Sequence, residues 1–222
     1  MNAADFIRTN TLVAHHVLVP EIALQLASEI TPIWQATEAW LQAAGVEPPF
    51  WAFAWPGSVA LARHVLDHPA KVAGRRILDF AAGGGLAAIA CAIAGAAAVE
   101  AAEIDGLAIA AIGVNAALNR VRLDVSGDVV GADCRWDLIL CGDVCYEAPM
   151  TAQILPWLRR MAGTAEVWIA DPGRAYLPRE GMQALFAMSV PTTVELEDTD
   201  RRQVTVWRLD PDQPETSPRR TG

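Results

Sequence analysis

A glycine-containing turn is the feature of this 222-residue sequence that most clearly indicates ligand chemistry. It runs from Asp79 to Gly85 as Asp-Phe-Ala-Ala-Gly-Gly-Gly, between a strand pattern and a helix pattern. Glycines here let a ligand approach the backbone closely, and the N-terminus of the following helix offers free amide donors. Dinucleotide-binding folds use a similar turn, so the turn alone leaves the ligand open.

Two details of the turn favour a positively charged cofactor. Asp79 places a carboxylate at the end of the strand, which a sulfonium tolerates and a pyrophosphate repels. The glycine spacing also differs from the G-x-G-x-x-G of dinucleotide sites. We therefore expect an S-adenosylmethionine site that includes Asp79, Ala81, Gly83 and Gly85. The alternative is a tight turn that only packs a strand against a helix.

Acidic residues after the next two strand patterns extend this expected site. Glu103 follows the loop by about twenty residues, where a carboxylate can accept hydrogen bonds from both ribose hydroxyls. Ile104 can pack on the adenine, whereas Asp105 could instead cap the next helix. Asp128 is a candidate for the adenine amine, and a simple turn is an equally good explanation.

A carboxylate and a phenol follow the fourth strand pattern, at the sheet edge where open α/β sheets bind ligands. Asp143 and Tyr146 could bracket an amine and direct it at a methyl group. The alternative is a helix cap at Asp143 and a packed Tyr146. Asp171, in an Asp-Pro-Gly-Arg turn, could hold the amine or pair with Arg174, and a plain turn is again the alternative.

Alternating strand and helix patterns from residue 76 predict a doubly wound α/β sheet with helices on both faces. A separate hairpin is expected at the end of the chain, from strands at 192–196 and 203–209. Near the start, Thr31-Pro32 favours a helix that ends near Gly45. The other expected strands lie at 22–26, 77–80, 98–104, 121–125, 137–141 and 166–170, and the other helices lie at 57–68, 84–94, 106–119 and 151–160.

We divide the chain into an N-terminal extension at 1–55 that contributes to the substrate side, a cofactor-binding domain at 56–210 and a disordered tail at 211–222. A hydrophobic fraction of 53% is typical of a globular protein, and the net charge of −9 opposes nucleic-acid binding. No apolar run reaches membrane-spanning length, and no leader pattern opens the chain.

The four cysteines and four histidines predict no metal site, because neither set has ligand spacing. His64 and His68 lack a third ligand at a fitting distance along the chain. The cysteines are expected to be buried free thiols, which favours a reducing, cytoplasmic location.

Taken together, these motifs closely resemble the lysine methyltransferases that modify the beta subunit of electron transfer flavoprotein. Those enzymes belong to the seven-strand methyltransferases with an Asp-x-x-Tyr motif. The Trp-Pro-Gly, Asp-x-x-Tyr and Asp-Pro-Gly-Arg motifs are the specific part of the resemblance. The similar segments are 49–57, 79–85, 103–105, 136–138, 142–146 and 171–174, and they span most of the chain.

The resemblance implies a Rossmann-like, seven-strand sheet with an antiparallel last strand. It also implies S-adenosylmethionine as cofactor, Asp143 and Tyr146 as catalytic residues, and a protein lysine of the flavoprotein beta subunit as acceptor. Ala81 replaces the first glycine of the family loop, and Glu103 stands where aspartate is common. Neither change suggests an inactive enzyme.

A lysine amine must lose its proton before it attacks a methyl group, because its reference pKa is about 10.4. We expect Trp51, Phe53 and Trp55 to form an apolar wall that favours the neutral amine, with Trp55 also contacting the cofactor. Either a carboxylate or water could accept the proton. The alternatives in function are a methyltransferase for a ribosomal protein or a nicotinamide-like amine, and a cofactor-binding module without activity. Nothing in the sequence indicates the oligomeric state.

Overall fold

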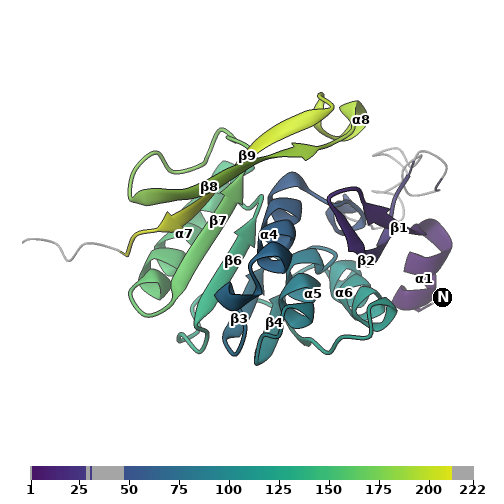
Figure 1. Cartoon of the computed structure of the whole chain (residues 1–222), viewed down its shortest axis with the longest axis horizontal. Coiled ribbons are helices and arrows are strands. Elements are labelled where there is room, and N and C mark those ends of the chain that lie inside the picture. Colours follow the sequence, from purple (N-terminus) through teal and green to yellow (C-terminus); the bar gives the residue numbers. More distant parts are fainter. Residues whose placement is uncertain (1, 29–30, 32–47, 212–222) are drawn as a thin grey trace, which may run out of the picture.

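A computed structural model of the chain describes residues 2–28, 31 and 48–211. The helix expected after Thr31 therefore lies outside the described residues, as does the tail apart from Pro211. Within the described part, a seven-stranded sheet forms the centre of the molecule (Figure 1).

The strand order of the sheet is β5-β4-β3-β6-β7-β9-β8. The first five strands in this order are parallel, whereas β9 runs antiparallel to both of its neighbours. The predicted doubly wound sheet with an antiparallel last strand is confirmed. The strands are β3 (Arg76–Phe80), β4 (Ala98–Ala102), β5 (Asp124–Ser126), β6 (Leu138–Gly142), β7 (Glu166–Asp171), β8 (Met182–Pro191) and β9 (Arg201–Leu209).

Helices cover both faces of the sheet because both faces of its strands are apolar. Leu138 and Leu140 on β6 join the core under α4 and α5, whereas Ile139 and Cys141 join the core under α7. Figure 1 shows α4, α5 and α6 on one side and α7 behind the sheet. These helices are α4 (Pro56–Asp67), α5 (Leu86–Ile93), α6 (Gly106–Leu118) and α7 (Ala148–Ala162), and a short 3-10 helix, η2 (Pro69–Lys71), follows α4.

The N-terminal residues form α1 (Ala3–Asn10) and an antiparallel pair, β1 (Leu12–His16) and β2 (Val19–Leu26). The strand expected at 22–26 is confirmed and is longer than predicted. Asn115 on α6 and Asn119 after it accept hydrogen bonds from the β2 amides of Gln25 and Ala23, at 2.8 and 2.9 Å. This pair therefore packs on the cofactor-domain core, and its contribution to substrate binding stays a prediction.

The expected strand at 192–196 is wrong. The first strand of the terminal hairpin is β8, and the connection to β9 contains a short helix, α8 (Val194–Glu197). β8 ends at Pro191. The residues after it alternate as in a strand, but they form a helical turn in which Glu197 is buried and paired with Arg174 and Arg202. The strand expected at 121–125 corresponds to β5, which starts later than expected, at Asp124.

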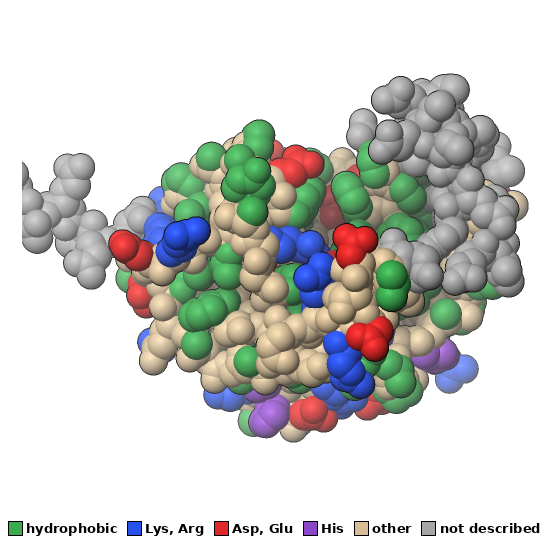
Figure 2. Space-filling view, turned by 90° about the horizontal axis from the view of Figure 1, so that it is seen from above, with side chains coloured by type: hydrophobic (Ala, Val, Ile, Leu, Met, Phe, Trp, Pro, Cys, Tyr) green, Lys and Arg blue, Asp and Glu red, His purple; other side chains and the backbone are tan. Residues whose placement is uncertain are grey.

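The described residues contain no helix that is long and apolar enough to cross a membrane. No three His, Cys, Asp or Glu residues in the same described part could hold a metal ion together. All four cysteines are free, and three are buried as expected, whereas Cys134 is half-buried. On the face seen from above in Figure 2, acidic, basic and hydrophobic side chains are interspersed and form no broad basic patch.

Candidate active site

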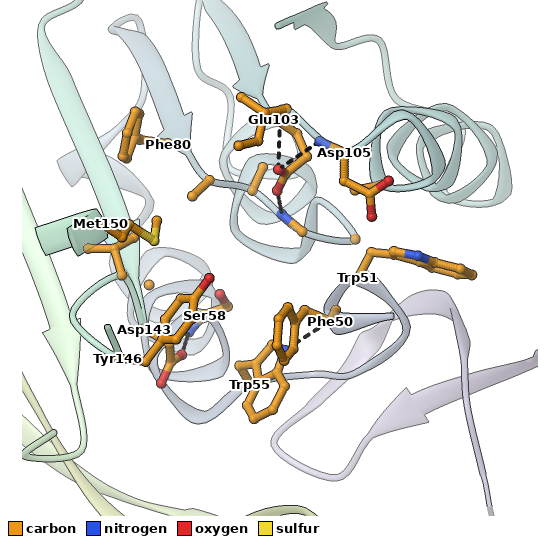
Figure 3. Close-up of a pocket in the computed structure, with 18 of the residues that line it drawn as sticks. Phe50, Trp51, Trp55, Ser58, Phe80, Glu103, Asp105, Asp143, Tyr146 and Met150 are labelled. Carbon is orange, nitrogen blue, oxygen red and sulfur yellow. Dashed lines mark hydrogen bonds between the residues drawn. The ribbon is translucent and has the colours of Figure 1, made fainter. Parts of the chain in front are cut away.

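A cavity of about 910 Å³ opens at the carboxyl edge of β3, β4 and β6. The glycine turn, the segment after β4, the segment after β6 and the aromatic segment before α4 all contribute to its walls. Figure 3 shows Glu103 on one side of this cavity and Asp143 with Tyr146 on the other. The sheet topology thus brings together residues that are far apart along the chain.

The glycine turn takes its shape from residues in the left-handed region. Gly83 and Gly85 have φ angles of +54° and +81°, and Ala81 has the unusual value of +53° for a residue with a Cβ. A Cβ at position 84 would lie 2.8 Å from the carbonyl oxygen of Trp51, so only glycine fits there. Ala81, Gly83 and Gly84 line the cavity, whereas Gly85 precedes α5 and does not.

Asp79 lies behind the turn and does not line the cavity. Its buried carboxylate accepts a hydrogen bond of 2.8 Å from the amide of Ala88 in the first turn of α5. Burial raises the pKa of Asp79 to about 7, and the nearby charge of Glu103 acts in the same direction. Asp79 therefore joins the end of β3 to the first turn of α5.

Glu103 holds the opposite side of the turn. Its carboxylate accepts hydrogen bonds from the amides of Gly83 at 2.9 Å and Ile104 at 2.7 Å. Asp105 caps α6 through the amide of Leu107 and also lines the cavity. Glu103 thus couples the turn to the end of β4, and its contact with a ribose stays a prediction.

Ile104 and Asp128 both line the cavity with Glu103. The side chain of Ile104 is large and apolar, and yet 79% of the residue is exposed. The carboxylate of Asp128 accepts a hydrogen bond of 2.8 Å from the amide of Val130, which makes it part of a turn as well. Both residues line the cavity, and their contacts with an adenine stay a prediction.

Asp143 follows β6 with a φ angle of +57° and is only 7% exposed. Its Oδ2 accepts hydrogen bonds from the amides of Gly57 at 2.6 Å and Ser58 at 3.3 Å, at the N-terminus of α4. Its Oδ1 accepts a hydrogen bond of 3.2 Å from Nη2 of Arg174. A helix N-terminus and a guanidinium therefore hold both oxygens of this carboxylate.

Burial raises the pKa of Asp143 to about 7, although Arg174 and the Gly57 amide oppose this shift. Tyr146 is 40% exposed at the mouth of the cavity. Partial burial raises the pKa of its phenol, and the carboxylates of Glu147 and Glu103 add to that effect. The pair thus combines a buried carboxyl group with a neutral phenol.

An aromatic wall of Phe50, Phe53 and Trp55 continues from Tyr146. The ring of Phe50 lies 5.7 Å from that of Tyr146 and 5.9 Å from that of Trp55, and Phe53 lies 5.9 Å from Trp55. Trp55 Nε1 donates a hydrogen bond of 2.8 Å to the carbonyl oxygen of Phe50, which fixes the segment. In Figure 3, Trp55 lies on the side of the cavity that carries Asp143 and Tyr146, across from Glu103.

Trp51 lines the cavity but points its ring away from Asp143 in Figure 3. The residue is 1% exposed and packs in a small core with Ile7, Ala108 and Ala111. It lies in the 3-10 helix η1 (Phe50–Ala52), where about three residues per turn point neighbouring rings in different directions. Phe50, which the sequence reasoning did not select, takes the position that Trp51 was expected to fill.

Comparison with known proteins identifies the family of this chain. The electron transfer flavoprotein beta subunit lysine methyltransferase of Danio rerio is 35% identical over 215 residues, covering 92% of this chain and 82% of the relative. The protein of that name from Homo sapiens is 31% identical over 217 residues, covering 93% and 81%. The chain belongs to this lysine methyltransferase family.

A broader family model, that of ribosomal protein L11 methyltransferase, matches residues 60–142. Among solved structures, Trm5b from Pyrococcus abyssi has a TM-score of 0.53 at 14% identity and covers 91% of this chain and 57% of its own. The methyltransferase SMU.776, crystallised with SAH, has a TM-score of 0.50 at 11% identity and covers 70% and 50%. These structures share the fold with this family member, which is an S-adenosylmethionine-dependent methyltransferase.

The cavity of this methyltransferase fits S-adenosylmethionine. Ile104 offers an uncovered apolar side chain, which suits a flat adenine ring. Oε2 of Glu103 accepts a hydrogen bond from the amide of Gly83 alone and can accept another, which suits a ribose hydroxyl. Ala81, Gly83 and Gly84 leave room for a ligand against the backbone. On this basis Glu103, Ile104 and the turn would hold the cofactor.

Asp171 does not line the cavity of the enzyme, whereas Arg174, at the end of the same motif, does. The Oδ1 atom of Asp171 accepts hydrogen bonds from the amides of Gly173 and Arg174, at 2.7 and 2.6 Å. The Asp-Pro-Gly-Arg turn therefore directs Arg174 toward Asp143. From the sequence we expected Asp171 to hold the amine or to pair with Arg174, and we expected no contact of Arg174 with Asp143.

Gly57, Ser58, Gly142 and Glu197 also shape the site, and sequence reasoning assigned none of them to it. A Cβ at position 142 would lie 2.5 Å from Oγ of Ser58, and one at position 57 would lie 2.6 Å from Oδ2 of Asp143. Only glycine at both positions permits α4 to approach the end of β6. The available signal was the Trp-Pro-Gly motif, whose proline occupies the first turn of α4.

Proposed function

We propose that this enzyme methylates lysine side chains of a protein, and that its substrate is the electron transfer flavoprotein beta subunit. The relatives of that name, which match more than nine-tenths of the chain at up to 35% identity, carry this proposal. The aromatic wall and the buried carboxylate give the site the features that a long aliphatic side chain with a terminal amine requires.

Asp143 and Tyr146 are the residues that orient the amine. Oδ2 of Asp143 already accepts two amide hydrogen bonds, whereas Oδ1 accepts one from Arg174 and can accept one more from an amine. With a pKa near 7, Asp143 is a stronger base than an ordinary carboxylate and can take up a proton at Oδ1 or Oδ2. Tyr146, which keeps its proton, aligns the amine by accepting an N–H hydrogen bond at its hydroxyl oxygen, so that the nitrogen lone pair stays free for the methyl group.

The aromatic wall of Phe50, Phe53 and Trp55 removes water from the amine. Ammonium groups are disfavoured where water is excluded, so the wall lowers the pKa of the lysine and favours the neutral nucleophile. Rings at this separation also provide a slot for the aliphatic part of the side chain. S-adenosylmethionine supplies an activated methyl group, and the protein's task is alignment.

Ribosomal protein L11 is the acceptor that the broader family model suggests. That model ends at residue 142 and so covers the cofactor side of the cavity without Asp143, Tyr146 or Arg174. The flavoprotein methyltransferases match across these residues as well. The longer match therefore favours the flavoprotein beta subunit as the acceptor.

The test is incubation of the enzyme and labelled S-adenosylmethionine with purified electron transfer flavoprotein, and separately with ribosomal protein L11, followed by peptide mass spectrometry. We expect a methylated lysine on the flavoprotein beta subunit. Methylation of L11 without methylation of the beta subunit would overturn the proposed substrate. Absence of methyl transfer to both proteins would contradict the proposed acceptor chemistry.

A further inference from the structure

A chain of charged side chains runs from Asp143 to the connection between β8 and β9. Nη2 of Arg174 donates hydrogen bonds to Oδ1 of Asp143 at 3.2 Å and to Oε1 of Glu197 at 2.7 Å. Oε2 of Glu197 in turn accepts a hydrogen bond of 2.9 Å from Nε of Arg202. One nitrogen therefore bridges the carboxylate of the site and a carboxylate of the terminal hairpin.

Glu197 is more deeply buried than the carboxylate of an ordinary surface ion pair. It is only 4% exposed, and Arg202 also donates a hydrogen bond of 2.6 Å to its backbone carbonyl. Glu197 and Arg174 both line the cavity, and the guanidinium of Arg174 lies 5.8 Å from the ring centre of Trp55. A buried carboxylate is costly unless it is paired, so this one depends on its arginines.

We propose that Glu197 is a positioning residue that holds Arg174 against Asp143, so that the β8–β9 connection controls the carboxylate that receives the lysine amine. Glu197 acts only through Arg174, and this inference rests on the proposed function for the role of Asp143. A free arginine side chain loses much conformational entropy when it is fixed, and the pairing with Glu197 stabilises the one arrangement that reaches Asp143.

The hydrogen-bond donors, charged groups and titratable groups around Asp143 come from four elements. The N-terminus of α4 contributes the amides of Gly57 and Ser58, and the turn after β7 contributes Arg174. Asp171 at the end of β7 and Cys145 after β6 are the other titratable groups that interact with it. Arg174 is the cation of this set and the strongest influence that lowers the pKa of Asp143 against its burial, so its placement should affect the ionisation of Asp143.

The test is a double-mutant cycle with Arg174→Gln, Glu197→Gln and the double variant. Two quantities are measured: kcat/KM for the protein substrate, and the pKa of the Asp143 carboxyl by carbon-13 NMR of the enzyme without substrates. We expect Arg174→Gln to lower kcat/KM about 10- to 100-fold and to raise the pKa of Asp143 by about one unit. Glu197→Gln should act in the same directions by less, and the double variant should equal Arg174→Gln alone.

Glu166→Gln is the matched control, because Glu166 pairs with Arg75 at 3.2 Å near the opposite edge of the sheet. It should leave both quantities unchanged. Thermal unfolding and SAH affinity of every variant report whether the fold and the cofactor site are intact.

Additive effects of the two substitutions, or a fall in the pKa of Asp143 in Glu197→Gln, would overturn the inference. Additivity would mean that Glu197 acts independently of Arg174, and a lower pKa would mean that it acts as a simple negative charge. If the unmutated enzyme methylates no protein lysine, the proposed function fails. In that case, the pKa of Asp143 in the two single variants and the double variant still shows whether Glu197 acts through Arg174.

Discussion

The amide of Gly57 donates a hydrogen bond of 2.6 Å to Oδ2 of Asp143, and these residues are 86 positions apart in the sequence. The contact joins the N-terminus of α4 to the end of β6. It explains why a Trp-Pro-Gly motif and an Asp-x-x-Tyr motif occur together in one chain. The glycine lets the helix approach the carboxylate, and the carboxylate caps the helix.

Gly57→Ala tests this contact directly. The added Cβ would lie 2.5 Å from the carbonyl oxygen of Ala170 and 2.6 Å from Oδ2 of Asp143. The helix must therefore move, and we expect methyl transfer to fall by about a hundredfold because small displacements disrupt alignment. Gly113→Ala is the control, since a Cβ there meets nothing within 4 Å. Equal activity of the two variants would contradict the proposed role of the close approach.

Glu103→Gln should weaken the binding of SAH about 10- to 100-fold, because a charge-assisted acceptor becomes a neutral one. The same change loosens the turn, since Glu103 accepts hydrogen bonds from the amides of Gly83 and Ile104. Isothermal titration calorimetry measures the affinity. Asp133→Asn, an exposed acidic residue outside the cavity, should leave it unchanged. Unaltered affinity in Glu103→Gln would remove Glu103 from the cofactor site.

Ala81→Gly should stabilise the fold. Ala81 has a φ angle of +53°, which costs a residue with a Cβ about 1 kcal/mol relative to glycine. For a chain of this size, that gain corresponds to a rise in Tm of about 2–4 °C. Ala152→Gly, at an exposed position inside α7, should lower Tm by a comparable amount because glycine weakens a helix interior. A lower Tm for Ala81→Gly would contradict the strain at this position.

The ionisation of Asp79 should lower the stability of the protein as the pH rises from about 4 to about 7. Burial raises the pKa of Asp79 to about 7 in the folded protein, whereas it ionises near its ordinary value in the unfolded chain. In this window the folded state binds more protons, so the free energy of unfolding falls until both states are ionised. Asp79→Asn should therefore shift the change in unfolding free energy from pH 5 to pH 8 toward more positive values, measured by urea denaturation.

Asp137→Asn controls for that experiment, because its ion pair with Arg76 lowers the pKa of Asp137 to about 2. The stability that Asp137 contributes is lost only as the pH falls below about 4. Its removal should leave the difference between pH 5 and pH 8 unchanged. A pH dependence in Asp79→Asn equal to that of the unmutated protein would show that Asp79 ionises normally.

The sequence predicted what is local and missed what depends on tertiary contacts. The glycine turn, Glu103 and the Asp-x-x-Tyr pair are short-range signals, and the alternation of elements brings them to one edge. The contacts of Gly57 and Arg174 with Asp143 span 86 and 31 positions, and no spacing rule reveals them. The residues at 192–196 alternate like a strand, but the burial of Glu197 between arginines favours a helical turn.

The most direct test compares Asp143→Asn and Tyr146→Phe with the unmutated enzyme, by kcat/KM for the flavoprotein beta subunit together with SAH affinity. Both variants keep the shape of the site, but Asn lacks the charge and basicity of Asp143, and Phe lacks the hydroxyl. We expect kcat/KM to fall at least about a hundredfold in Asp143→Asn and about tenfold in Tyr146→Phe, with SAH affinity unchanged. Full turnover in both variants, with unchanged SAH affinity, would contradict the assignment of the amine to Asp143 and Tyr146.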